Sequence, residues 1–156
     1  MSTSLTRRKV VYADFDALIA DVSALRSAAS YRRCGQWSLA GNCEHMGKAI
    51  EMSLHGTDLK VPLLLRMAGP VMLKITLWRG KIPAGIQGPP ELMPAQGMAT
   101  SDVEAADAFL KTIHRYIAFT SELHPSPLFG KLSRAKWDQL HLLHAAHHFS
   151  FIVPDA

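Results

Sequence analysis

The segment SRAKWDQLHLLHAAHHFSFI, residues 133–152, contains four of the eight histidines of the chain. At about 100° per residue on a helix, His144 and His148 lie one turn apart and point the same way. Trp137 and Leu140 lie close to the same direction, so both histidines should face a core. A neutral imidazole in an apolar environment needs a hydrogen-bond acceptor or a metal ion. The spacing therefore predicts a helix over 133–152 with an inward histidine pair suited to one metal ion.

Simpler interpretations of this segment stay open. A buried carboxylate or a backbone carbonyl could satisfy the pair, because no HExxH or CxxC motif accompanies it. His141 and His147 could belong to a solvated face of the helix. His141 lies within about 60° of His144 in direction. It is therefore either an outer residue or proton carrier of a metal site, or a solvent-exposed side chain.

A second histidine is expected to face inward from a helix over about 38–54. Ser38 is suited to cap its first turn, and Gly56 to end it. His45 shares one face of this helix with Asn42, so it should point into the core. The alternative is a core histidine bonded to a neighbour. Cys43 diverges from His45 by about 200°, and we expect it to be a small buried hydrophobe rather than a ligand.

Two further amphipathic helices complete a core. Asp14 is a predicted N-cap, and the helix after it has apolar residues at helical spacing: Phe15, Leu18, Ile19, Val22 and Leu25. Ser101 and Glu104 form a capping box that opens a helix to about Leu123, with an expected buried stripe of Val103, Ala106, Leu110, Ile113 and Ile117. Because no strand-like alternation appears, the sequence predicts an all-α fold, an antiparallel four-helix bundle.

The middle of the chain adds an apolar segment and a proline-rich one. Residues 61–78 are apolar but contain Arg66, Lys74 and two prolines, which argue against a transmembrane span. We expect one extra short helix here, buried or at an interface and kinked at Pro70. Residues 80–97 contain four prolines and no helical periodicity. They are expected to form an ordered, extended loop packed over the bundle.

Composition limits the class of protein. A chain of 156 residues that is 48% hydrophobic and 19% charged is expected to form a single globular domain over 1–156. The net charge of +4 comes from short basic runs without interleaved aromatic residues, so nucleic acid is not an expected partner. Two cysteines and no signal-peptide pattern indicate a cytoplasmic protein. No membrane partner is expected, and residues 61–78 could form a homodimer interface.

Several short patterns resemble a known family. They are Gly35-Gln36-Trp37-Ser38-Leu39, Glu44-His45-Met46, His124-Pro125 with Phe129-Gly130-Lys131-Leu132, and Trp137 followed by His144-Ala145-Ala146-His147-His148. Over about residues 8–154 the chain resembles the DinB-like (YfiT-like) superfamily, within a bacterial branch of unestablished activity. The resemblance implies a four-helix bundle with a divalent metal ion, nickel or zinc. Carried over by position, its ligands are His45, His144 and His148.

The resemblance also implies a small-molecule substrate. Characterised members include S-transferases that use a low-molecular-weight thiol such as bacillithiol or mycothiol, and amide hydrolases or isomerases of thiol metabolism. Three histidines leave coordination positions open, as in catalytic zinc sites. The residues do not choose between a hydrolase and a thiol S-transferase, because no inward carboxylate stands out as a general base. The alternative is a metal-free helical module for binding or dimerisation, without catalysis.

Overall fold

The computed structural model describes residues 6–82, 88–95 and 100–155, and in these residues the chain is mostly helical. Five α-helices, a 3-10 turn and a two-stranded antiparallel sheet are present in this part of the chain. The elements are α1 (Phe15–Ser27), β1 (Tyr31–Arg33), α2 (Leu39–His55), α3 (Leu63–Arg79), η1 (Pro90–Leu92), α4 (Asp102–Ala118), α5 (Arg134–Phe149) and β2 (Ile152–Pro154). The predicted helical bundle is confirmed.

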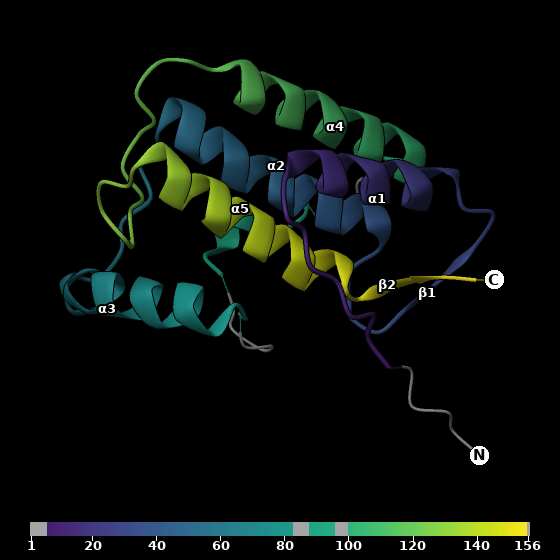
Figure 1. Ribbon diagram of the computed structural model, residues 1–156, viewed down its shortest axis with the longest axis horizontal. Helices are drawn as coiled ribbons and strands as arrows, with labels where there is room; N and C mark the ends of the chain where they lie inside the picture. The colour runs from purple at the N-terminus through teal and green to yellow at the C-terminus, as the bar shows by residue number, and fades with distance from the viewer. Residues whose placement is uncertain (1–5, 83–87, 96–99, 156) are drawn as a thin grey trace.

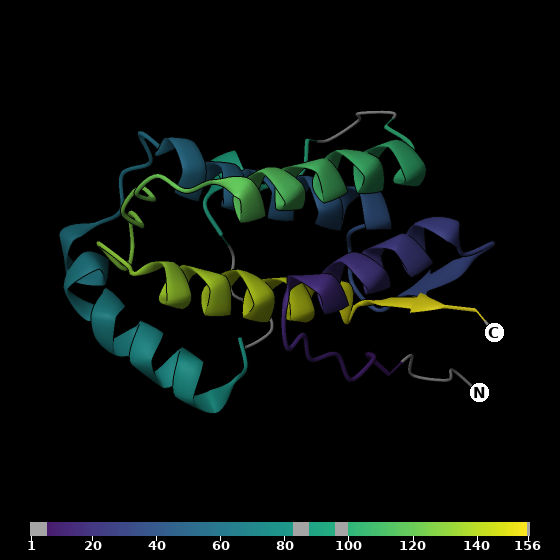
Figure 2. The ribbon, with the colours of Figure 1, turned by 45° about the horizontal axis from the view of Figure 1, so that its top comes forward.

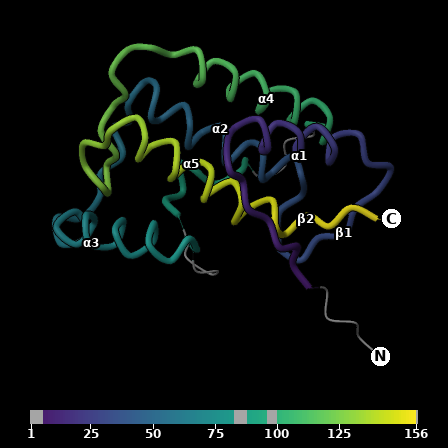
Figure 3. Tube along the Cα trace, viewed as in Figure 1, coloured from purple at the N-terminus to yellow at the C-terminus, as the bar shows by residue number. Residues whose placement is uncertain are grey.

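Four of the helices enclose the core. α2 packs against α4 and α5, and α1 packs against the same two helices from the other side. In Figure 1, α1 and α5 run toward the sheet, whereas α2 and α4 run away from it. The large side chains buried between them include Leu18, Met46, Ile50, Phe109, Ile113, Tyr116, Trp137 and Phe149. Figure 3 shows β1 and β2 side by side at one end of the bundle, where β2 follows α5 directly.

The predicted helix starts are confirmed, because each N-cap is a local interaction. The side chains of Asp14, Ser38 and Ser133 each accept a hydrogen bond from the backbone N–H three residues later. Ser101 and Glu104 form both hydrogen bonds of the capping box. The start of every helix around the core is thus encoded within four residues.

The predicted end of α4 is wrong, and its predicted buried stripe is confirmed only at Ala106 and Ile113. The helix ends at Ala118 rather than near Leu123, because the Arg134 guanidinium donates to the carbonyl oxygens of Tyr116 and Phe119 and satisfies the last turn. The buried residues are Ala105, Ala106, Phe109, Thr112, Ile113 and Tyr116, so the core-facing direction is rotated by about 80° from the predicted stripe. Val103 and Ile117 of that stripe are exposed.

The last helix also ends earlier than predicted. α5 stops at Phe149, and Ile152 is the first residue of β2, which pairs with β1 in the register Arg33 with Ile152. The Cys34 N–H donates to the Phe151 carbonyl and extends this pairing. The sheet was not anticipated because strands of three residues are too short to show an alternating pattern.

The middle segment is a longer helix than predicted, and of its two predicted environments the buried one is wrong whereas an interface stays a prediction. α3 has 17 residues, as many as α2 and α4, so it is not short. Only Gly69 and Leu73 of this helix are buried. Pro70 lies inside the helix. Figures 1 and 2 show α3 beside the bundle rather than within it. Among the described residues, no helix is long and apolar enough to cross a membrane.

The proline-rich segment is described only in part. Residues 83–87 and 96–97 lie outside the described residues. Residues 88–95 include η1, which packs on α2. In this portion, the expectation of a loop over the bundle agrees with the structure.

Candidate metal centre

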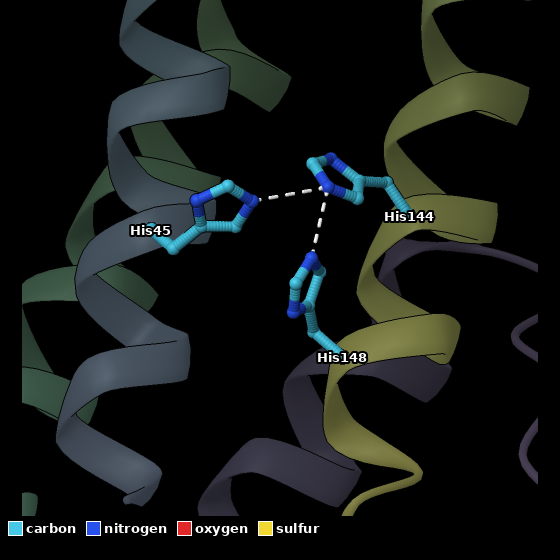
Figure 4. Close-up of side chains that lie close together, drawn as sticks. All are labelled: His45, His144 and His148. Carbon is cyan, nitrogen blue, oxygen red and sulfur yellow. Dashed lines mark hydrogen bonds between the residues drawn. The ribbon is translucent and has the colours of Figure 1, made fainter. Parts of the chain in front are cut away.

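Three histidines from two helices meet inside the bundle. His45 lies on α2, and His144 and His148 lie on α5 (Figure 4). The His144 Nε2 is 3.2 Å from the His45 Nε2 and 3.1 Å from the His148 Nε2. One ring nitrogen from each residue lies within 4.8 Å of those of the other two. The i and i+4 spacing on α5 and the inward face of α2 therefore bring together the three residues expected from the sequence.

The outer nitrogens of two rings are held by oxygen acceptors. The His45 Nδ1 lies 2.7 Å from the Leu92 carbonyl oxygen, and the His148 Nδ1 lies 3.2 Å from the Asn42 Oδ1. The Asn42 Nδ2 donates to the Ser38 carbonyl, so its Oδ1 is the acceptor that faces His148. Both histidines then have a proton on Nδ1, and each Nε2 directs its lone pair toward the centre of the cluster.

Burial keeps these rings neutral. Desolvation lowers the pKa of His45, and it lowers the pKa of His148 to about 2, with the charges of His45 and His147 as further causes. The pKa of His144 falls well below its usual value, because of burial first and then because of the neighbouring histidines. Neutral imidazole is the form that ligates metal ions, so the ligands are ready for a cation at neutral pH.

Aromatic rings form one wall of the cluster. The Trp37 indole stacks on the His148 ring at 5.3 Å with an interplanar angle of 5°, and it lies 5.0 Å from the His45 ring. The His147 ring meets His148 edge-on at 5.0 Å. Arg7 donates to the His147 carbonyl at 3.0 Å. These contacts limit the rotation of the ligand rings.

The turn η1 is fastened above the site by α2. The Lys48 ammonium donates to the Met93 carbonyl at 2.7 Å, and the Glu44 carboxylate accepts from the Ala95 N–H at 3.1 Å. Lys48 and Glu44 also form an i, i+4 ion pair. The two charged side chains thus position the backbone of residues 92–95, and with it the Leu92 carbonyl that orients His45.

The spacing of the nitrogens suits a tetrahedral ion. Two nitrogens that bind one zinc ion at about 2.0–2.1 Å lie roughly 3.3–3.4 Å apart at the tetrahedral angle. The two measured separations, 3.1 and 3.2 Å, are within a few tenths of that value. In the metal-free state the His144 Nε2–H can donate to the other rings. Moving that proton to Nδ1 frees a third lone pair without a change of charge.

His141 is not part of this cluster. It is 2% exposed, so the solvent-exposed interpretation is wrong. Its Nε2 lies 3.0 Å from the Ser53 Oγ, its ring stacks on Trp137 at 5.0 Å, and Tyr116 meets it edge-on. Burial lowers its pKa to about 3, which leaves a neutral core histidine. His147 is half-buried against His148 rather than on a solvated face.

Sequence reasoning missed three contributors to the site. Asn42 was placed on the face of His45, and its spacing of three residues from His45 was a usable signal. Trp37 has no sequence signal beyond its place in the pattern Gly35-Gln36-Trp37-Ser38-Leu39. The Leu92 carbonyl belongs to a loop backbone and had no sequence signal. Cys43 is buried, and desolvation raises the pKa of its thiol, in agreement with the predicted hydrophobic role.

The fold and the site define a helical-bundle protein with a three-histidine group that could hold a metal ion. A family model described as "Protein of unknown function (DUF1569)" matches residues 4–155, and the chain belongs to this family. No curated protein and no solved structure matches the chain.

Proposed function

We propose that this protein is a metal-dependent enzyme in which His45, His144 and His148 hold a divalent zinc or nickel ion. One observation supports this most directly. Three neutral imidazoles converge on one point, and the outer nitrogens of two of them are engaged by oxygen acceptors. A neutral core histidine needs one hydrogen-bond partner for its ring N–H, and for His141 that partner is the Ser53 hydroxyl. Two inward lone pairs aimed at a third imidazole are more than a structural role requires.

The surroundings of the site favour thiol chemistry. A divalent ion with open positions would lower the pKa of a coordinated thiol or water. Within the described part of the chain, the hydrogen-bonding and ring contacts of the three histidines from other residues come from Trp37, Asn42, Leu92 and His147, and none is a carboxylate. Water attack is helped by a general base, whereas a thiolate is itself the nucleophile. We therefore favour a thiol S-transferase of the DinB-like kind.

Hydrolysis is the second candidate, and His147 is the observation that favours it. Burial and the charge of Arg7 lower the pKa of His147, so its ring is in the neutral form that a general base needs, with its Nδ1 3.5 Å from the Arg7 guanidinium. It lies edge-on against the His148 ring at 5.0 Å. In either reaction the partner is a small molecule, and in the first it includes a low-molecular-weight thiol.

Metal content of the untagged protein tests the proposal. Near-stoichiometric zinc or nickel is expected in the wild type, and loss of most of it in His45→Ala and His148→Ala. His114→Ala is the matched control, because His114 is an exposed histidine on α4. Plasma mass spectrometry measures the metal. A wild type that is empty and takes up neither ion would refute the proposal and leave a metal-free binding module.

A second arm separates the two reactions. The metal-loaded protein is assayed for consumption of a small thiol in the presence of an electrophile, and separately for hydrolysis of a simple amide. His147→Phe should impair hydrolysis and leave thiol transfer largely unchanged, because only water attack would need its ring as a base.

A further inference from the structure

The outward face of α3 is apolar, the reverse of an ordinary surface helix. Its five most exposed large apolar side chains are 62–83% exposed and are Leu63, Leu64, Met67, Val71 and Trp78. On a helical wheel, where successive residues are about 100° apart, these five side chains span an arc of about 100° in total. The buried Gly69 and Leu73 lie on the opposite side. A surface helix normally directs its apolar stripe to the core. An apolar stripe that faces outward instead is typical of a binding surface for a partner outside the bundle.

The attachment of α3 to the bundle is narrow. Gly69 packs against the backbone of Leu128, so closely that a Cβ at this position would overlap the Leu128 carbonyl oxygen. Close approach at this glycine seats the middle of the helix on the loop before α5 and leaves the apolar face outward. Figures 1 and 2 show α3 standing to one side of the four packed helices.

The charge of this region has a single sign. Five cationic side chains lie on α3 or next to its ends, and no acidic residue occurs between Asp58 and Glu91. The five are Lys60, Arg66, Lys74, Arg79 and Lys81. Among the described residues none of them forms an ion pair, although eight such pairs are present elsewhere. On the helical wheel Lys74 lies within the apolar arc, and Arg66 and Arg79 lie on either side of it.

A groove beside the first turns of α3 is also lined by cationic residues. It has a volume of about 740 Å³ and lies between α3 and the loop 125–130. Its lining includes Lys60, Arg66 and the backbone of Gly130, and it contains no acidic residue. An anionic group could enter this groove while the apolar face is covered.

Charge decides between two occupants of this face. A second copy would place its own five cations against the first five, and like charges in contact oppose association. A membrane surface with anionic headgroups has an apolar region that can bury leucine, methionine and tryptophan side chains. Its negative charge attracts the flanking cations. Long lysine and arginine side chains reach the headgroups while their stems stay in apolar surroundings. We propose that α3 binds the surface of an anionic lipid membrane, with its axis along the surface and its apolar face in the headgroup region.

Vesicle binding tests this proposal. The protein is mixed with phosphatidylcholine vesicles or with mixed phosphatidylcholine–phosphatidylglycerol vesicles, and binding is measured by flotation. Binding to the anionic vesicles only is expected, and it should weaken as salt is added. Of the three tryptophans, Trp78 is 83% exposed, Trp137 is buried and Trp37 stacks on His148, so membrane insertion should shift the fluorescence of Trp78 to the blue. Trp78→Phe should remove most of this shift.

Paired variants assign the effect to α3. Removing three cations with Arg66→Gln, Lys74→Gln and Arg79→Gln should lower the partition coefficient on the order of 100-fold, since each cation near an anionic surface contributes about a factor of five to ten. The control removes the exposed Lys9, Lys111 and Lys136 and has the same net charge. For the apolar part, Leu64→Gln with Met67→Gln is compared with Val103→Gln plus Ile117→Gln on α4. The α4 pair should bind like the wild type.

Three outcomes would overturn the proposal. The first is no binding to either vesicle, and the second is binding that the α3 variants and their controls change equally. The third is a concentration-dependent dimer, measured by analytical ultracentrifugation, that Leu64→Gln with Met67→Gln dissociates while the vesicles remain unbound. That third result would identify a second copy as the occupant. Metal content, measured on the same samples, should be unaffected by every α3 variant.

Discussion

Replacing Asn42 with alanine should weaken metal binding while leaving the bundle folded. The Asn42 side chain is 2% exposed, and its Oδ1 is the acceptor 3.2 Å from the His148 Nδ1. Its Nδ2 is fixed by the Ser38 carbonyl at 2.9 Å, which prevents the amide from turning its nitrogen toward His148. Alanine removes the acceptor, and the tight burial leaves little room for a water molecule to replace it.

The size of the effect follows from the length of this hydrogen bond. Partners of the outer nitrogen of a ligating histidine change metal affinity by about 10- to 100-fold. The bond to Asn42 is long at 3.2 Å, whereas the bond of His45 to the Leu92 carbonyl is 2.7 Å. We therefore expect the low end of the range for Asn42→Ala, about tenfold, which corresponds to about 1.4 kcal/mol.

Competition with a chelator gives the dissociation constants of each variant for zinc and for nickel, and these constants measure the effect. Ser53→Ala is the matched control. It removes another buried polar side chain of α2, one that contacts His141 rather than the three-histidine cluster. Metal binding by Asn42→Ala as tight as that of the wild type and of Ser53→Ala would refute an orienting role for Asn42. Thermal unfolding of the metal-free variants shows whether any loss of affinity reflects a damaged fold.

Two further predictions concern the fold. The low pKa of His141, about 3, means that the unfolded chain binds its proton below about pH 6.5 while the folded protein does not, so stability falls with acidification through that range. At about pH 4.5 this one residue should cost about 2–3 kcal/mol of stability relative to neutral pH. Urea unfolding of His141→Leu should lack that part of the pH dependence, and an unchanged dependence would contradict the assignment. Gly69→Ala should destabilise the protein by about 1–3 kcal/mol, because its Cβ would overlap the Leu128 carbonyl. Gly47→Ala has open space at its Cβ, so it should stabilise the protein by up to about 1 kcal/mol. Each kcal/mol shifts the melting temperature by about 2–4 °C, and melting temperatures that rise in both variants would refute the close approach at Gly69.

The parts of the fold that the sequence predicted are those with local causes. The caps at Asp14, Ser38, Ser101 and Ser133 depend on residues within one turn, and all four are present. The inward direction of His45 and of the pair on α5 depends only on helical periodicity. Such features need no knowledge of the rest of the chain, because neighbours in sequence fix them.

The parts that failed have causes far away in the sequence. α4 ends at Ala118 because Arg134, on another helix, satisfies its last carbonyls. Its buried face includes Tyr116 and Thr112, whose hydroxyl groups bond to Asp138 and Glu51, and a hydrophobic pattern does not count such residues as core. For α3, apolar composition suggested burial, but only the contact of Gly69 with Leu128 shows which side faces the bundle.

Periodicity on α5 does not separate a ligand from a core histidine, because His141 and His144 differ only slightly in direction. The difference lies in what engages each Nε2. That of His141 faces the hydroxyl of Ser53, and its ring is enclosed by Trp137 and Tyr116. One turn later, acceptors from α2 and from η1 bind the outer nitrogens of the cluster, so its Nε2 atoms face one another. His45 and His148 differ from His141 because an oxygen acceptor engages the outer nitrogen of each ring, and that condition depends on packing between helices that only the folded chain provides.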